Sequence, residues 1–278
     1  MTVSDISVVS VCYNSADIVR EMLKSVPANT NIILVDNGSQ DVAELEPIAE
    51  TNGATLVKNT NNVGFGVACN QGAELADTEF VFFLNPDTVL TSETLAGLVR
   101  AARKHPDCVA FNPLIIDPQG KASLKRRSVL IPKRDWLPRG LLEKDTIVPI
   151  LSGAAFFVRK SDFDSVGGFD PEIFMYHEDD DLSLRLRSDR GNLMVAAGAR
   201  VTHTPGTSTV RAVEVSKIKA FGMGKSRIYT ARKHNVPFGE LRAVLQAVLQ
   251  LFSISMFSSR KRAKNIAFFR GVMSEIFV

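Results

Sequence analysis

The chain has 278 residues, of which 45% are hydrophobic and 23% charged, and its net charge is +3. This composition excludes a disordered chain, and the small net charge argues against a nucleic-acid-binding protein. The cysteines Cys12, Cys69 and Cys108 lie in or beside apolar runs, which indicates buried free thiols and neither disulfides nor a zinc site. The first residues lack a basic region followed by a long apolar core, so we expect no signal peptide and predict a cytoplasmic location.

Four short apolar runs come first along the chain. They are rich in Val, Ile and Phe and do not alternate with polar residues, which is typical of strands buried on both faces of a parallel sheet. These runs are residues 6–11, 31–35, 54–57 and 79–84. Helical patterns separate them, and the alternation of strand and helix predicts a doubly wound α/β layer.

Polar segments follow three of the predicted strands, at residues 13–15, 36–41 and 85–87. In an α/β sheet of this kind, ligands bind beyond the carboxyl ends of the strands. Asn, Asp, Gly and Ser also form turns, which could explain any one of these segments alone. Because all three segments fall on the same edge of the predicted sheet, they indicate a ligand site there.

The chain continues with a predicted helix at residues 92–105 and strands at 108–116 and 154–160. Between these strands, residues 119–145 are basic and lack periodicity, which predicts a mobile loop over the edge of the sheet. The pattern after residue 213 is helical throughout. We therefore expect a boundary near Thr209, which divides an α/β domain of residues 1–209 from a helical segment of residues 210–278.

Four adjacent carboxylates, from Glu178 to Asp181, open one further predicted helix. An ordinary helix start would explain one or two of them, because carboxylates interact favourably with the N-terminal end of the helix dipole. Four carboxylates repel one another, and this repulsion raises at least one pKa toward the range of a general base. The cluster therefore indicates either a crowded helix start or a catalytic base.

Six motifs, taken in order, carry a resemblance to a known family. They are VSVCYNS, ILVDNGSQD, NNVGFGVACNQG, FFLNPDT, the segment at residues 152–187, and ARVTHTPGTS. Together they resemble the family 2 glycosyltransferases, nearest to bacterial rhamnosyltransferases of cell-surface polysaccharide assembly, over residues 5–235. The resemblance implies the GT-A fold, in which a Rossmann-like nucleotide-binding half and an acceptor-binding half share a mixed central sheet. It also implies sugar transfer from a nucleoside diphosphate with inversion at the anomeric carbon.

The resemblance assigns the acidic cluster to catalysis. It implies that Asp179 is the base that takes the proton of the acceptor hydroxyl, while Glu178 and Asp181 hold its position and charge state. An inverting displacement needs one base and a stabilised leaving group, and no covalent nucleophile.

The segment NPD is similar to the metal-binding DxD motif of the family, with Asn85 in place of the first aspartate. Asp87 is implied as a ligand of Mg²⁺ or Mn²⁺, which bridges the diphosphate oxygens, and His203 as a second ligand. Because one carboxylate is missing, we expect weak metal binding without nucleotide. A lone histidine after a strand can also be an ordinary hydrogen-bonding residue.

The donor is expected to be a UDP- or dTDP-sugar. Asp36 and Asn37 close the second strand, where the family holds the base and ribose, and a side-chain oxygen there can accept the N3–H of uracil or thymine. Glycines in the next motif allow a close backbone approach, although turn formation explains them equally well. The other residues expected beside the nucleotide are Val11, Tyr13, Asn14, Asn62, Gly64, Gly66, Asn70 and Asn85.

Residues 239–257 form a predicted helix that is nearly all apolar, too short and interrupted for a membrane span. Basic clusters at residues 231–234 and 258–264 flank it, which is typical of a helix lying in the surface of an anionic membrane. The alternative is a helical hairpin packed on the enzyme or on a second subunit. The expected partners are a nucleotide-sugar, a glycan or lipid-linked acceptor and the inner face of the cell membrane; a homo-oligomer stays open, and no nucleic acid is expected.

A different class of function also stays open, namely a non-catalytic nucleotide-sugar-binding or scaffold protein that keeps the GT-A fold. The presence of Asp87, Asp179 and His203 argues against this alternative, while Asn85 leaves room for it. A nucleotidyltransferase would need a glycine-rich phosphate loop with a lysine near the N-terminus, and VCYNSADIVR has neither feature.

Overall fold

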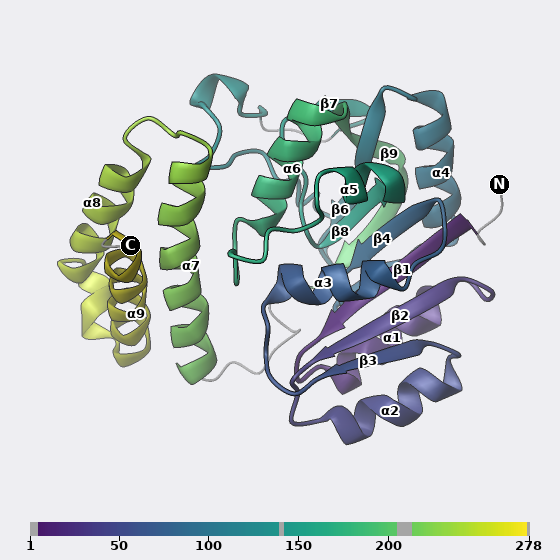
Figure 1. Ribbon diagram of the computed structural model, residues 1–278, viewed down its shortest axis with the longest axis horizontal. Coiled ribbons are helices and arrows are strands. Elements are labelled where there is room, and N and C mark those ends of the chain that lie inside the picture. Colours follow the sequence, from purple (N-terminus) through teal and green to yellow (C-terminus); the bar gives the residue numbers. More distant parts are fainter. Residues whose placement is uncertain (1–4, 139–141, 205–212, 277–278) are drawn as a thin grey trace.

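A nine-stranded sheet forms the centre of the computed structural model, which describes residues 5–138, 142–204 and 213–276 (Figure 1). Its first part is a parallel layer in the order β3-β2-β1-β4. All residues of β1 are buried, as the non-alternating pattern predicted. The bounds of these strands are β1 Ile6–Cys12, β2 Asn31–Asn37, β3 Thr55–Asn59 and β4 Phe80–Leu84.

The second part of the sheet is mixed. β8 (Ala155–Arg159) runs antiparallel between β4 and β6 (Cys108–Ile116), and β9 (Asn192–His203) runs parallel to β6. Two short strands, β5 (Thr88–Leu90) and β7 (Thr146–Val148), pair with β9. Neither short strand was expected, because three residues are too few to show a periodic pattern.

Helices cover both faces of the sheet and explain why its strands are apolar without alternation. One face packs on α1, α2 and α4, and the other on α3, α5 and α6, whose Leu182 and Leu186 are fully buried. Cys12, Cys69 and Cys108 are buried free thiols, as predicted. The helix bounds are α1 Ala16–Ser25, α2 Val42–Thr51, α3 Phe65–Glu74, α4 Thr94–Lys104, α5 Lys160–Ser165 and α6 Glu178–Asp189.

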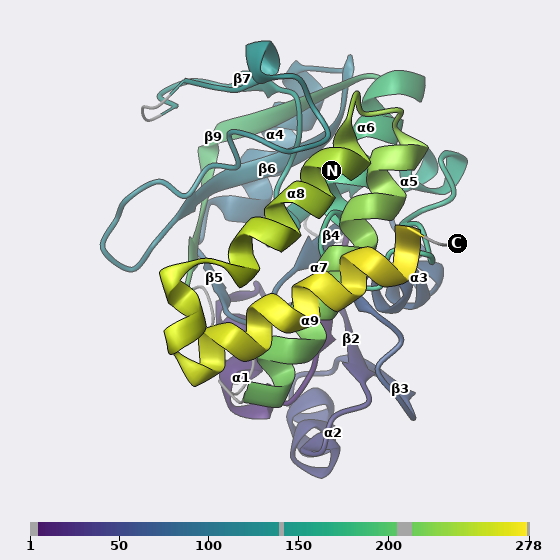
Figure 2. The same cartoon turned by 90° about the vertical axis from the view of Figure 1, so that its left-hand side faces the viewer.

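The C-terminal helices pack beside this α/β domain, with α7 between the sheet and the other two (Figures 1 and 2). They are α7 Val213–Lys233, α8 Gly239–Leu251 and α9 Ser259–Ile276, with the short 3₁₀ helix η3 Ile254–Phe257 before α9. Gly224 and Gly271 let α7 and α9 cross closely, because a Cβ atom at either position would collide with the main chain of the opposite helix. The predicted boundary at Thr209 lies outside the described residues.

The predicted helix at 239–257 is shorter than expected, since α8 ends at Leu251. The side-chain amide of Asn265 donates to the carbonyl of Gln250, and the Ser253 hydroxyl donates to the same carbonyl, so the end of α8 is capped by side chains. Within the described residues, no helix is both long and apolar enough to cross a bilayer.

Candidate active site

A cavity of about 500 Å³ opens at the carboxyl ends of the parallel strands, where the polar segments were predicted to meet. The strands β1, β2 and β4 and their following loops provide one part of its lining, and α6, β9 and α7 another. The remainder comes from the start of α3 and from the segments that precede it, β8 and α6. Predicted site residues in this lining are Val11, Tyr13, Asn37, Asn62, Asn85, Glu178, Asp179 and His203. Other lining residues include Phe65, Gly153, Phe174, Tyr176, Ile218 and Lys219.

The other predicted site residues do not belong to this lining. Asn70 holds α3 against the segment before α6, because its side-chain amide donates to the carbonyl of Phe169 and accepts the N–H of that residue, at 2.8 and 2.9 Å. Asn14 has a positive φ of 50°, and its side-chain oxygen accepts the N–H of Gln40 at 2.8 Å. These residues shape the walls of the cavity.

Gly64 and Gly66 permit a close approach of α3 to the segment at 169–174. A Cβ atom at Gly64 would lie 2.7 Å from the carbonyl oxygen of Phe174, and Gly64 has a φ of 94°. A Cβ atom at Gly66 would lie 2.9 Å from the Cβ of Phe169. Both glycines are therefore required by packing next to the cavity.

Asn37 and Asp36 differ in the hydrogen-bonding capacity that remains. The side-chain oxygen of Asn37 already accepts the N–H of Val63 at 3.0 Å, and its amide donates to Asn62 and Gly64. Asp36 accepts the N–H of Ser39 with Oδ2, while its buried Oδ1 has no partner. A buried oxygen without a partner is costly, so a donor from a ligand would stabilise Asp36.

Asp179 stands in the first turn of α6 and is held on both oxygens. Its Oδ2 accepts the N–H of Gly153 at 2.8 Å and lies 2.6 Å from Nζ of Lys125, and its Oδ1 accepts the N–H of Asp180 at 2.9 Å. Burial alone would lower the pKa of Lys125, but the carboxylates of Asp179 and Asp180 raise it above its ordinary value. The segment 119–145 thus brings a permanent cation to the acidic cluster, a contact that its composition did not predict.

The predicted upward pKa shift occurs at Glu178. Burial, and then the charge of Asp179, raise the pKa of Glu178 to about 8, and its Oε2 has no hydrogen-bond partner. Asp180 lies 3.1 Å from Nδ1 of His177; burial would raise its pKa, but His177 and Lys125 lower it. The crowded charges are therefore relieved in two ways, because one carboxyl is protonated at neutral pH and the others face cations.

Asp181 lies outside the cavity lining and is fully buried. Its carboxylate contacts Arg185 at 2.7 Å and both Lys233 and His234 at 2.8 Å, which joins the start of α6 to the end of α7. Burial would raise the pKa of Asp181, but His234, Arg185 and Lys233 lower it to about 2. Any effect of Asp181 on Asp179 is thus exerted through the position of the helix.

Asp87 and His203 meet where β5 pairs with β9, because Thr88 and His203 are partners in the antiparallel register. Nε2 of His203 lies 3.2 Å from Oδ1 of Asp87, and neither buried Asp87 oxygen has a hydrogen-bond partner. Two ligands of one Mg²⁺ at right angles lie roughly 3 Å apart. The pair fits a divalent cation.

A metal held by this pair would need further ligands from its substrate. The described part of the chain contains no group of three or more His, Cys, Asp or Glu side chains that could hold a metal ion. Mg²⁺ in proteins keeps several waters and uses one or two carboxylates together with substrate phosphates. The site therefore fits a cation that is bound together with a diphosphate.

Lys219 of α7 also lines the cavity and was not predicted as a site residue. Burial lowers the pKa of its ammonium group, and the nearby charge of Asp87 opposes this shift. The sequence around Lys219 showed only helical periodicity, which does not reveal that this face of α7 closes the cavity over the sheet.

The sequence matches known proteins over most of its length. Residues 7–167 match the profile described as Glycosyl transferase family 2. An N-acetylglucosaminyl-diphospho-decaprenol L-rhamnosyltransferase of Mycobacterium tuberculosis is 30% identical over 237 residues, which cover 73% of this chain and 77% of that protein. The rhamnosyltransferase WbbL of Escherichia coli (strain K12) is 26% identical over 223 residues, covering 71% of this chain and 80% of that protein.

Solved structures share the fold at low sequence identity. GalNAc-T7 with UDP, GalNAc and Mn²⁺ superposes with a TM-score of 0.60 at 19% identity, covering 98% of this chain and 56% of that chain. The mannosyltransferase PcManGT from Pyrobaculum calidifontis, in complex with GDP-Man and Mn²⁺, also gives 0.60, at 14% identity, covering 98% and 87%. These similarities confirm the predicted GT-A fold with its mixed sheet.

Proposed function

The chain belongs to glycosyl transferase family 2, and we propose that it transfers rhamnose or a related sugar from UDP or dTDP to a hydroxyl group of a lipid-linked glycan. We propose that transfer inverts the configuration at the anomeric carbon. The rhamnosyltransferases of Mycobacterium tuberculosis and Escherichia coli support the sugar, and the name of the mycobacterial relative supports a lipid diphosphate acceptor. The observation that carries the proposal is that Asp179, Asn85 and His203 line one cavity at the carboxyl ends of the parallel strands.

The nucleoside part of the donor is assigned to the ends of β1 and β2. Asp36 is favoured over Asn37 as the acceptor for N3–H of uracil or thymine, because only Asp36 has an oxygen without a partner. Val11 and Tyr13 would flank the base, since both line this part of the cavity. Asn14, Gly64, Gly66 and Asn70 contribute by holding the walls.

Asp179 is assigned as the base. The acceptor oxygen attacks the anomeric carbon from the face opposite the diphosphate, a C–O bond forms as the bond to the phosphate oxygen breaks, and the hydroxyl proton moves to the Asp179 carboxylate. The N–H of Gly153 and the ammonium of Lys125 fix the Oδ2 side of this carboxylate, while Oδ1 has one backbone partner and keeps a lone pair for the proton. Protonated Glu178 keeps a second negative charge away from the reacting centre.

A second set of residues would compensate the negative charge that develops on the departing diphosphate. Asp87 and His203 would hold Mg²⁺ or Mn²⁺, and this cation supplies Lewis-acid stabilisation of the diphosphate when it is bound. Lys219 lines the cavity, and the charge of Asp87 acts on the pKa of its ammonium group. We assign Lys219 to bind a phosphate oxygen.

The test is a transfer assay with the purified full-length chain, Mg²⁺ or Mn²⁺, a panel of UDP- and dTDP-sugars and a short-chain lipid-diphosphate acceptor. Release of the nucleoside diphosphate that depends on the acceptor supports the proposal, and NMR of the product reports the anomeric configuration. Binding of a nucleotide-sugar without transfer to any acceptor would favour a non-catalytic scaffold. A product that retains the donor configuration would contradict the role of Asp179.

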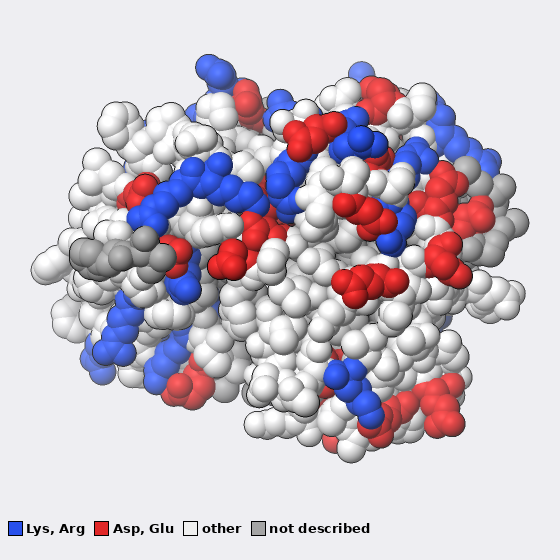
Figure 3. Space-filling view, viewed as in Figure 1, with Lys and Arg blue, Asp and Glu red and all other residues white. Residues whose placement is uncertain are grey.

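We further propose that the enzyme works at a membrane surface. Large apolar side chains at the end of α8 and in η3 are exposed: Phe252, Ile254 and Phe257 are exposed by 84, 87 and 91%. Together with Leu241, Leu245 and Leu249 they form a surface that we call the apolar ridge. Basic residues gather over this helical part of the molecule, on the left of Figure 3. An apolar ridge beside cations fits the interface of an anionic bilayer.

A further inference from the structure

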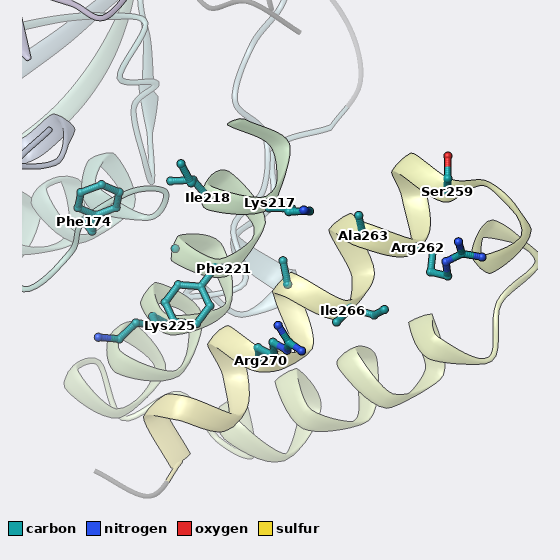
Figure 4. A pocket seen from close by; sticks show the side chains of 12 residues that line it. Phe174, Lys217, Ile218, Phe221, Lys225, Ser259, Arg262, Ala263, Ile266 and Arg270 are labelled. Atoms are coloured by element: carbon teal, nitrogen blue, oxygen red, sulfur yellow. The ribbon is translucent and has the colours of Figure 1, made fainter. Parts of the chain in front are cut away.

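A second cavity, of about 860 Å³, lies between α7 and α9 (Figure 4). We call it the helical groove. Its apolar lining comes from Phe174 of the α/β domain, Ile218 and Phe221 of α7, and Ile266 with two alanines of α9. Ile218 and Phe221 are 50 and 40% exposed, although they are large apolar side chains. Exposed apolar surface inside a concave site is typical of a ligand site.

Four cations lie around this apolar lining: Lys217, Lys225, Arg262 and Arg270. Lys217 pairs with Glu214 at 2.7 Å, and Lys225 lies 3.5 Å from Glu275. Over the described ranges, the side chains of Arg262 and Arg270 form no ion pair with a carboxylate, so the groove keeps excess positive charge. Arginine binds phosphate oxygens in a bidentate manner.

The helical groove adjoins the candidate active site. Phe174 and Ile218 line both cavities, so the same two side chains form the wall between them. A ligand in the groove would therefore place its end next to the cavity that Asp179 lines. The first turn of α9, which follows the apolar ridge in sequence, also lines the groove. The groove therefore lies close in sequence to the part of the chain that we assign to the membrane contact, the apolar ridge.

We infer that the helical groove binds the isoprenoid diphosphate portion of the acceptor. The apolar lining would hold the first isoprene units, Arg262 and Arg270 the diphosphate, and the attached sugar would extend past Phe174 and Ile218 toward Asp179. This inference rests on the proposed function and names the subsite that recognises its acceptor. A free glycan would leave the apolar lining of the groove unused.

The inference is tested by calorimetry of the full-length chain with farnesyl diphosphate, in EDTA so that the metal-dependent donor site does not bind the diphosphate. The double variant Arg262→Gln/Arg270→Gln is expected to bind at least about tenfold more weakly, because it loses charge-assisted hydrogen bonds to the diphosphate. Phe221→Ser, which tests the apolar lining, should also weaken binding. The matched control Lys264→Gln/Arg187→Gln removes two exposed charges outside the groove and should bind like the wild type.

Inorganic diphosphate and farnesol, each tested alone, should bind far more weakly than farnesyl diphosphate, because each satisfies only one half of the groove. The inference is overturned if the wild type does not bind farnesyl diphosphate at millimolar concentration, or if the groove variants bind it as tightly as the control. This outcome is distinct from failure of the proposed function, which would appear as absence of transfer from every nucleotide-sugar while binding of farnesyl diphosphate still depends on Arg262 and Arg270.

Discussion

Replacing Glu178 with glutamine is expected to stabilise the protein at neutral pH. Burial and the neighbouring Asp179 raise the pKa of Glu178 from 4.5 to about 8 in the folded chain. The group is protonated in both states below pH 4.5, and its penalty on folding grows as the pH rises to about 8. Each pKa unit corresponds to about 1.4 kcal/mol. At pH 7 the Glu178 carboxyl is ionised only in the unfolded chain, and this difference lowers the free energy of unfolding by roughly 3 kcal/mol. Glutamine keeps the neutral form and avoids this loss.

The measurement is urea unfolding of the wild type and Glu178→Gln at about pH 5, 7 and 8, followed by the fluorescence of Trp136, the only tryptophan. The variant should gain stability relative to the wild type as the pH rises. Glu50→Gln, at an exposed carboxylate of α2, is the control and should show no such gain. Parallel pH profiles for the wild type and Glu178→Gln would mean that Glu178 ionises normally, and our explanation of the crowded cluster would be wrong.

Three further changes test separate parts of the molecule. Asp87→Ala should weaken nucleotide binding in Mn²⁺ but not in EDTA, because the cation would link this carboxylate to the diphosphate; equal calorimetric affinities in Mn²⁺ would contradict the metal site. Asp181→Asn should cost about 3 kcal/mol of unfolding free energy at pH 7, since Arg185 and Lys233 lose the buried carboxylate that they contact, whereas exposed Asp189→Asn should cost little. Because the pKa of Asp181 is lowered from 3.8 to about 2, its contribution should fade as the pH falls from 3.8 toward 2, and a pH-independent difference would refute this. Leu249→Asp/Phe257→Asp should reduce sedimentation of the full-length chain with anionic vesicles by at least about tenfold. Unchanged sedimentation would exclude the apolar ridge as the membrane contact. If the wild type is a dimer and the substitutions dissociate it, the ridge would instead contact a second copy of the chain.

Much of the sheet could be predicted because its strands are buried on both faces. The runs at 6–11 and 79–84 are apolar without alternation, and the structure places helices against both sides of them. The polar ends of β1, β2 and β4 do meet at one cavity, since parallel strands bring their carboxyl ends to one edge.

Residues that reach the site from distant segments could not be predicted in the same way. Lys125 belongs to a segment without periodicity, and its contact with Asp179 depends on how that segment folds back over the sheet. Lys219 lies on a helix whose orientation is fixed by the close crossing at Gly224 and Gly271, a tertiary contact that no local pattern reveals. The helical groove has the same origin, because its two walls are separated by more than one helix in sequence.

The preference for Asp36 over Asn37 also needed the structure. Both side chains end β2 and both carry an oxygen that can accept a hydrogen bond, so residue type alone does not distinguish them. The backbone N–H of Val63, between β3 and α3, already uses the Asn37 oxygen, whereas Oδ1 of Asp36 has no partner.

The role of Asp179 is tested most directly by Asp179→Asn, measured for both sugar transfer and nucleotide affinity. Asparagine keeps the shape of the side chain and an oxygen for the N–H of Gly153, but it cannot take a proton from the acceptor. We expect transfer to fall by about 10²- to 10⁴-fold while nucleotide affinity stays within about twofold of the wild type. Turnover close to that of the wild type would contradict the assignment of Asp179 as the base.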